Sequence, residues 1–302
     1  MFESAELGHE VDKATWKKEQ PVLREDLLAA QFELLEKNAF PVVILVAGVD
    51  GSGRGETVNL LNAWMDPRTI ETHGLELPSG EEQRFPPMWR YWRVLPPRGK
   101  IGILFGSWYT APILGRVEGK LKSGALESSI GEINRFERML ADEGVLLLKF
   151  WFHLSKKFQK KRLKKLEKDP ATQWRVTDLD WERFERYDDF VETCEHVLQR
   201  TSHGHAPWIV VEANDSRYRN LTVGKALLGA VRRRLDSEPG ADAPSVLPAE
   251  PVGGRNVIAS LDLTQRLEED EYEKRLETLQ GRLNKLSRHK RFNQTGVVAV
   301  FE

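Results

Sequence analysis

The sequence predicts an α/β fold in which helices cover both faces of a parallel sheet. Four continuous apolar runs have the length of a β-strand, and stretches with helical periodicity separate them. A strand without polar alternation is typical of a parallel sheet, because both of its faces are buried. The alternation of such strands with helices predicts a three-layer, doubly wound domain.

The elements follow from these patterns in chain order. Strands are expected at residues 41–47, 101–105, 145–151 and 208–212. Helices are expected at residues 16–38, 55–65, 130–143, 155–168, 181–200 and 219–235. Pro21 fits the first helix only near its start, since proline lacks the N–H that a helix interior requires.

Composition limits the function classes. Lys and Arg number 45 against 46 Asp and Glu, so the net charge of −1 gives no general attraction to nucleic acid or anionic membrane. The single cysteine, Cys194, excludes an internal disulfide and suits a reducing cytoplasm. No apolar run approaches the roughly 18 residues of a membrane span, and no leader peptide opens the chain. We expect a cytoplasmic protein with neither membrane nor nucleic-acid partners.

The chain divides into three parts. Residues 1–236 are predicted to form the α/β domain. Residues 237–255 are rich in Pro, Gly and Ala without periodicity, which predicts a linker. Residues 256–302 predict a helix and a strand that repeat the opening of the chain and would begin a second, truncated module. The matching positions are Trp16 with Tyr272, Leu23 with Leu279, Leu27 with Leu283, and 42–47 with 297–302. The alternative is a C-terminal helix and edge strand that pack on the first domain.

A glycine-rich loop follows the first strand and precedes a helix. Residues 48–55, the glycine loop, read Gly-Val-Asp-Gly-Ser-Gly-Arg-Gly. The spacing matches G-x-x-x-x-G-K of P-loop folds, in which backbone N–H groups and a helix start bind phosphate. The sequence thus predicts a P-loop NTPase-like fold; the alternative is a tight strand-to-helix turn. The phosphate-binding candidates are Gly48, Gly51, Ser52, Gly53, Arg54 and Gly55.

Three residues of the glycine loop bear on its chemistry. Arg54 stands where the lysine of the motif belongs, and Gly55 where Ser or Thr normally holds magnesium. Asp50 could bind Mg²⁺ directly or through water, or could be a turn former. An arginine can pair with a phosphate oxygen but does not replace a lysine that follows a transferring phosphoryl group.

A basic stretch follows the third predicted strand. Residues 156–168 contain eight cationic side chains: Lys156, Lys157, Lys160, Lys161, Arg162, Lys164, Lys165 and Lys168. Such a run can be a solvated helix face. Its place after the carboxyl end of a buried strand, where ligands of open α/β sheets bind, favours a helical lid over a polyanion.

Further motifs resemble the polyphosphate kinase 2 family in order and spacing, over about residues 16–235. After the glycine loop they are Trp89–Pro96, Ser107–Tyr109, Phe136–Leu140, Lys149–Trp151, Asp169–Pro170, Trp174–Thr177 and His205–Trp208. The linker and the restarting helix are similar to the two-module members, the polyphosphate:AMP phosphotransferases. The resemblance implies magnesium-dependent phosphoryl transfer between inorganic polyphosphate and AMP or ADP, with a second module of the same polypeptide and a homo-oligomer as further partners.

The resemblance also implies site residues. Asp50 and Arg54 match catalytic positions, and Arg90, Lys149 and Arg175 match residues that contact phosphates. Where active members carry Asp-Arg before Ser-Trp-Tyr, this sequence has Phe105 and Gly106. A magnesium ligand and a phosphate clamp are therefore both absent.

Two classes of function compete. The first is a polyphosphate-dependent phosphotransferase module whose own site has decayed. The second is a non-catalytic module for polyanion binding and dimerisation, which the residues at 105 and 106 favour for this domain alone. A more distant alternative is a nucleoside or nucleotide kinase that uses ATP as donor.

Overall fold

The computed structural model describes residues 1–237, 266–294 and 296–299. Residues 1–82 and 88–237 belong to one compact unit, and α10 belongs to another, described by itself. The strands are β1 (Val42–Gly48), β2 (Ile70–Gly74), β3 (Ile101–Phe105), β4 (Leu146–His153) and β5 (Trp208–Glu212). The helices are α1 (Lys13–Glu36), α2 (Arg54–Trp64), α3 (Trp89–Trp92), α4 (Thr110–Val117), α5 (Ser123–Asp142), α6 (Lys156–Lys168), α7 (Asp178–Glu185), α8 (Tyr187–Thr201), α9 (Ser216–Asp236) and α10 (Glu269–Ser287). The 3-10 turns are η1 (Glu3–Ala5), η2 (Glu82–Arg84), η3 (Gln173–Arg175) and η6 (Lys290–Gln294).

The sheet is parallel and has the strand order β2-β3-β1-β4-β5. The four predicted strands are confirmed, and the glycine loop follows the central one. Strand β2 escaped prediction because it lies at the sheet edge, where only Ile70 of its five residues is buried. A short edge strand with one buried side chain lacks the apolar run on which the other predictions rest.

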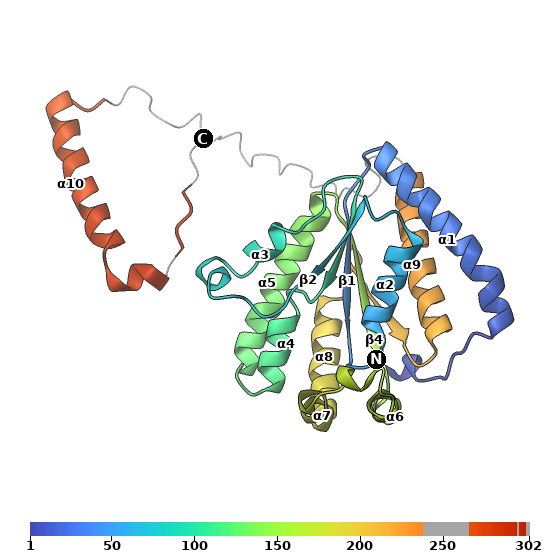
Figure 1. The fold of residues 1–302 in the computed structure, drawn as a ribbon. Coiled ribbons are helices and arrows are strands. Elements are labelled where there is room, and N and C mark those ends of the chain that lie inside the picture. Colours follow the sequence, from blue (N-terminus) through green and yellow to red (C-terminus); the bar gives the residue numbers. More distant parts are fainter. Residues whose placement is uncertain (238–265, 295, 300–302) are drawn as a thin grey trace, which may run out of the picture. The chain divides into compact units, whose positions relative to one another are not determined.

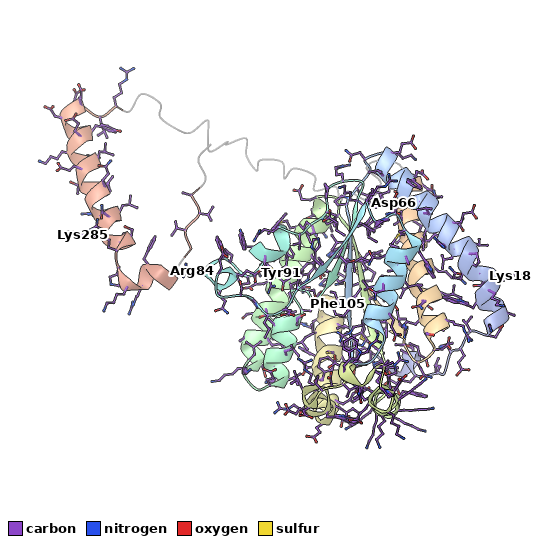
Figure 2. The ribbon with its side chains drawn as sticks, viewed as in Figure 1. Lys18, Asp66, Arg84, Tyr91, Phe105 and Lys285 are labelled. Atoms are coloured by element: carbon purple, nitrogen blue, oxygen red, sulfur yellow. The ribbon has the colours of Figure 1, made fainter. Side chains whose placement is uncertain are left out.

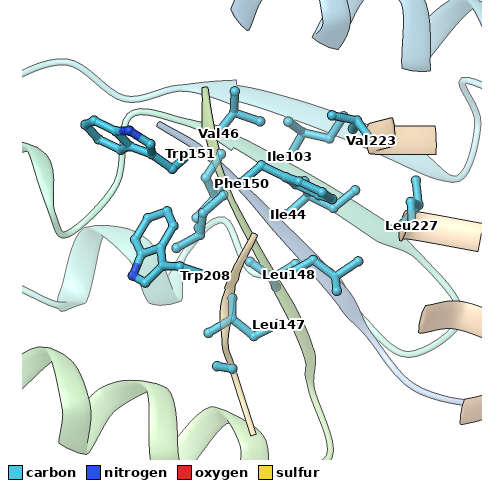
Figure 3. Close-up of a cluster of buried hydrophobic side chains, with 14 of the residues drawn as sticks. Ile44, Val46, Ile103, Leu147, Leu148, Phe150, Trp151, Trp208, Val223 and Leu227 are labelled. Atoms are coloured by element: carbon cyan, nitrogen blue, oxygen red, sulfur yellow. The ribbon is translucent and has the colours of Figure 1, made fainter. Parts of the chain in front are cut away.

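Helices cover both faces of the sheet, as predicted (Figure 1). Helices α1, α2 and α9 pack with one another on one face, and α4, α5 and α8 on the other. Figure 3 shows Val223 and Leu227 of α9 on one side of the strands, and Trp151 and Trp208 on the opposite side. Helices α6 and α7 lie at the carboxyl end of the central strands, which is the edge where the glycine loop begins.

Helix α1 differs from the prediction in one respect. It begins at Lys13, where Asp12 accepts hydrogen bonds from the N–H groups of Ala14 and Thr15, so Pro21 lies in the helix interior. The expectation that Pro21 is acceptable only near the helix start was wrong, because it is the ninth residue of α1. Residue 21 is exposed, and solvent there can satisfy the carbonyl that a proline leaves without a donor.

The N-terminal segment closes one side of the carboxyl edge. The ring of Phe2 stacks on His153 at 4.6 Å between centroids, and His153 Nε2 lies 2.8 Å from Glu6 Oε1. The buried carboxylate of Glu212, at the end of β5, accepts hydrogen bonds from the backbone N–H groups of Gly8 and His9. This segment covers the ends of β4 and β5, so the open part of the edge lies nearer the glycine loop.

The C-terminal unit contains the predicted amphipathic helix, α10, with exposed leucines at positions 276, 279, 283 and 286. The strand expected at 297–302 is not formed over residues 296–299, because a strand requires a paired neighbour and these residues pair with none among those described. Most of the predicted linker, 238–255, lies outside the described residues. The division into module, linker and second module stays a prediction.

None of the helices in the described ranges has both the length and the apolar character to cross a membrane.

A buried ion pair joins the core of the sheet to α5. Lys149 Nζ lies 2.6 Å from Glu137 Oε2, and neither side chain has exposed surface. The same ammonium donates to the carbonyl of Thr201 and to the hydroxyl of Tyr109, so its three protons are all used. Burial lowers the pKa of Lys149, while Glu137 acts in the opposite direction. The expected contact of Lys149 with phosphate does not fit this geometry.

We therefore predict that Lys149 serves stability. Lys149→Met should lower the free energy of unfolding by about 3–5 kcal/mol, because it leaves the Glu137 carboxylate buried without its charge partner. The double variant with Glu137→Leu should regain most of that loss. Denaturant unfolding of the three proteins tests this, and a Lys149→Met protein of unchanged stability would contradict the structural role.

Candidate functional site

The glycine loop lies between β1 and α2 and depends on its glycines for its shape. Gly51 and Gly53 have φ of 77° and 81°, in the left-handed region, and Gly53 is the N-cap of α2. A Cβ on Gly48 would lie 2.2 Å from the carbonyl oxygen of Phe152 in β4. A Cβ on Gly53 would lie 2.2 Å from the guanidinium of Arg219. The loop approaches its neighbours too closely for side chains at these two positions.

Arg54 interacts with protein groups on two sides. Its Nη2 lies 2.7 Å from Asp50 Oδ1, and its guanidinium lies over the ring of Phe105 at 5.5 Å. Phe105 is the last residue of β3, on the strand beside β1 (Figure 2). The two residues that depart from the family pattern, Arg54 and Phe105, thus contact each other. A cation over an aromatic face is attracted by the ring quadrupole.

Gly106 carries the third departure. Its φ is +91°, and a Cβ at this position would lie 2.1 Å from the carbonyl oxygen of Leu75. An arginine therefore cannot stand here unless the backbone moves.

Glu56 forms ion pairs with arginines from three elements beside the loop. Its carboxylate lies in the first turn of α2, 2.7 Å from Arg162 of α6, 3.8 Å from Arg175 of η3 and 3.0 Å from Arg219 of α9. Arg183 of α7 approaches the other loop carboxylate, Asp50, at 3.7 Å. Arginines of α6, η3 and α7 therefore face the glycine loop and meet carboxylates there.

A cavity of about 620 Å³ begins at the glycine loop. Gly48, Asp50 and Arg54 form its loop end. Apolar and aromatic side chains of α4, α7 and α8 also line it, together with Trp151: Ile113, Leu114, Val117, Leu179, Tyr187 and Phe190. Charged residues of α7 and of the turns that follow α4 and α7 line it as well: Glu118, Lys120, Glu182, Arg183, Glu185 and Arg186. The cavity thus combines the glycine loop with aromatic, apolar and charged side chains.

Two buried polar atoms in the cavity wall lack a hydrogen-bond partner among the described residues. They are Nε1 of Trp151 and Oε1 of Gln159. Gln159 uses its Nε2 to donate to the carbonyl of Asp50, which leaves the acceptor oxygen unpaired. The hydroxyl of Ser52, inside the loop, is also buried without a partner. Unpaired buried donors and acceptors cost free energy unless a ligand or water satisfies them.

Helix α6 bears the predicted basic stretch. It starts at the N-cap Ser155 and packs on η3 and α7, while its lysines are exposed at positions 156, 157, 160, 161, 164, 165 and 168. Long side chains extend outward from this end of the molecule in Figure 2. Arg162, by contrast, is partly buried and turned to Glu56.

The structure brings some of the predicted site residues together and separates others. Asp50, Arg54 and Arg175 lie around the glycine loop. Arg90 does not line the cavity; it is 8% exposed, and its Nε lies 3.4 Å from Glu82 Oε1. Sequence patterns missed Glu56 and Arg219, since only the folded chain brings α9 behind the loop.

Protein side chains alone do not form a metal cluster in the described part of the chain. Among the described residues, no three His, Cys, Asp or Glu side chains are grouped to hold a metal ion. Asp50, the predicted ligand, has one oxygen bonded to Arg54 and the other near Arg183. Magnesium is usually held by one or two carboxylates together with phosphate oxygens and water. Asp50 could supply one such ligand, since one hydrogen bond from Arg54 leaves its carboxylate with further acceptor sites.

Comparisons with known proteins assign the chain to a family. The family model described as Polyphosphate kinase 2 matches residues 10–239. The chain is 52% identical to a polyphosphate:AMP phosphotransferase of Pseudomonas aeruginosa and 46% identical to one of Pseudomonas syringae pv. tomato. In both cases the match covers the whole chain but 61% of the relative. This chain therefore spans about three fifths of the length of those relatives.

Solved structures give the same assignment. A crystal structure from Pseudomonas aeruginosa PA01, assigned to polyphosphate kinase 2, is 49% identical, with a TM-score of 0.80 over 97% of this chain and 57% of that one. Polyphosphate Kinase 2 from Arthrobacter aurescens TC1 is 28% identical, with a TM-score of 0.73 over 78% of this chain and 85% of that one. The family model covers far more than half of the sequence, and the chain belongs to the polyphosphate kinase 2 family.

Proposed function

We propose that this chain is the polyphosphate- and nucleotide-binding first module of a polyphosphate:AMP phosphotransferase, and that its own catalytic site has decayed. The observation that carries the proposal is the cavity that is lined both by the glycine loop and by aromatic and apolar side chains. Phosphates would lie at the loop, where helix α2 begins, and a nucleoside would extend toward α8. The names of the relatives support AMP as the nucleotide.

Polyphosphate would approach along α6. Its seven exposed lysines lie on a helix whose partly buried face carries Arg162 toward the glycine loop. A flexible polyanion suits a row of exposed ammonium groups, because each lysine acts as a point charge without a fixed geometry. The cations near the loop would then neutralise the terminal phosphates.

Decay of the catalytic site is supported by three linked positions. Arg54 is bonded to Asp50 and covers Phe105, so it does not provide the mobile ammonium of an active loop. Phe105 offers no metal ligand, and Gly106 has no room for a side chain. Magnesium would enter as a complex with the substrate phosphates, with Asp50 as a protein ligand.

The strongest alternative is a purely non-catalytic module for polyanion binding and dimerisation, and the same three positions favour it. Binding to a second module and a homo-oligomeric state both remain predictions. A kinase that uses ATP is the other alternative, and competition between long-chain polyphosphate and ATP for the purified chain separates it from the proposal.

We predict that Gly53→Val weakens binding of inorganic tripolyphosphate by at least about tenfold. The new side chain meets Arg219 and must adopt a left-handed backbone, which disturbs the loop amides. Gly124→Val is a matched control, because a Cβ there has open space and φ is not positive. Isothermal titration of both variants tests this, and equal affinity in the two would exclude the loop as the phosphate site.

We predict that reversing Lys160, Lys161 and Lys164 to Glu removes most polyphosphate affinity, with a loss of at least about tenfold at low salt. Each exposed cation about 4 Å from a phosphate is worth about 1 kcal/mol in water, and salt screens this attraction. Reversal of Lys13, Lys17 and Lys18 on α1 changes the net charge equally and serves as control. Equal losses in both triple variants would mean that only net charge matters.

We predict little or no ADP formation from AMP, polyphosphate and magnesium by the 302-residue chain. Loss of one stabilising arginine can cost about 10³-fold or more in phosphoryl transfer. The double variant Arg54→Lys with Phe105→Asp should restore only a small part, because Gly106 cannot be replaced without moving the backbone. An active family member assayed in parallel is the positive control. Robust turnover by the unmodified chain would contradict the proposed decay of the catalytic site.

A further inference from the structure

Arg219 lies beneath the glycine loop and takes no part in the binding scheme above. It belongs to the second turn of α9, and 2% of its side chain is exposed. Burial lowers the pKa of its guanidinium, but an arginine keeps its charge inside a protein. A buried cation behind a phosphate-binding loop requires an explanation, since an unpaired buried charge is costly.

The hydrogen bonds of Arg219 join the loop to three parts of the fold. Its Nε donates to the hydroxyl of Thr57 in α2 at 2.9 Å, and its Nη1 donates to the carbonyl of Ser52 in the loop at 3.2 Å. Nη1 also donates to the carbonyl of Ala213, after β5, at 3.3 Å. Nη2 donates to Glu56 at 3.0 Å. The planar guanidinium thus fixes the loop carbonyl, the first turn of α2 and the end of β5 relative to one another.

The contact with Gly53 adds a second function. The ideal Cβ position of Gly53 lies 2.2 Å from Nη1, so the guanidinium fills the space directly behind the residue that caps α2. The positive charge therefore lies next to the backbone N–H groups that would bind phosphate. In a site of low dielectric, such a charge acts on a bound anion without touching it.

We propose that Arg219 is a positioning residue for the phosphate site: it holds residues 52–57 in the anion-binding shape and supplies fixed positive charge from behind. The proposal rests on the anion-binding role of the loop proposed above. Glu56 opposes this charge, because its carboxylate pairs with Arg219 at the same helix start. Arg219 strengthens anion binding, whereas Glu56 weakens it.

The proposal predicts opposite changes in anion affinity for variants of Glu56 and Arg219, and this separates it from a purely structural role. If the pair only stabilised the fold, Glu56→Gln and Arg219→Gln would both weaken anion binding, because each breaks the same ion pair. If charge matters, Glu56→Gln should tighten tripolyphosphate binding by about threefold, and Arg219→Gln should weaken it by about tenfold or more. Arg219→Lys keeps the charge but loses the planar set of hydrogen-bond donors of the guanidinium. Its affinity for tripolyphosphate should therefore lie between those of wild type and Arg219→Gln.

A second background removes one ambiguity. Glu56 also meets Arg162 and Arg175, so its neutralisation could act by releasing those two arginines. The gain from Glu56→Gln should therefore be measured again in a background that carries Arg162→Gln and Arg175→Gln. We expect the gain to persist there, because the carboxylate of Glu56 acts on a bound anion through its own charge. Loss of the gain in that background would assign the effect to Arg162 and Arg175 and overturn the electrostatic part of the proposal.

The experiment is titration of the full chain and its variants with inorganic tripolyphosphate, together with amide hydrogen exchange of residues 50–57. Exchange should be faster in Arg219→Lys and Arg219→Gln than in wild type; unchanged exchange and affinity would overturn the proposal. If Arg219→Gln does not fold, the tripolyphosphate affinity and the hydrogen exchange of Arg219→Lys test the proposal instead. If wild type binds no tripolyphosphate, the proposed function fails for this chain. The hydrogen-exchange rates of residues 50–57 would still show whether Arg219 holds the loop in place.

Discussion

The parallel pairing of β1 with β4 is the constraint on which the candidate site depends. It continues from Val42 with Leu146 to Gly48 with Phe152, so the glycine loop must leave the sheet in contact with β4. The carbonyl of Phe152 lies where a Cβ of residue 48 would be and also accepts a hydrogen bond from the N–H of Val49. Because β4 leads directly to α6, this pairing also places the basic helix beside the loop.

Two of the three departures from the family pattern contact each other. An aspartate at the end of β3 would face a loop cation as a charge partner, whereas the ring of Phe105 attracts Arg54 through its face. Asp50 is the second partner of Arg54, at 2.7 Å. The backbone of Gly106 has a conformation that excludes a side chain. A reversion at Arg54 or Phe105 alone would therefore leave the other residue without its partner.

Sequence patterns predicted the sheet and the loop because both depend on local chemistry. Apolar runs identify buried strands such as β1, and closely spaced glycines identify a loop that needs positive φ. The patterns gave no indication of Arg219 behind the loop, because its partners in the loop and in α2 are separated from it by more than 150 positions along the chain. Lys149 shows the opposite error. Its position in a family motif suggested a contact with phosphate, but its burial with Glu137 makes it part of the core.

The charges around the loop are consistent with the proposed polyanion site in a nearly neutral chain. Asp50 and Glu56 together meet Arg54, Arg162, Arg175, Arg183 and Arg219. The two carboxylates partly neutralise five arginines that would otherwise repel one another. In the proposed complex, a phosphate chain would bring more negative charge than these carboxylates and would compete for the exposed arginines. Arg219 is buried and would stay in place as a fixed positive charge.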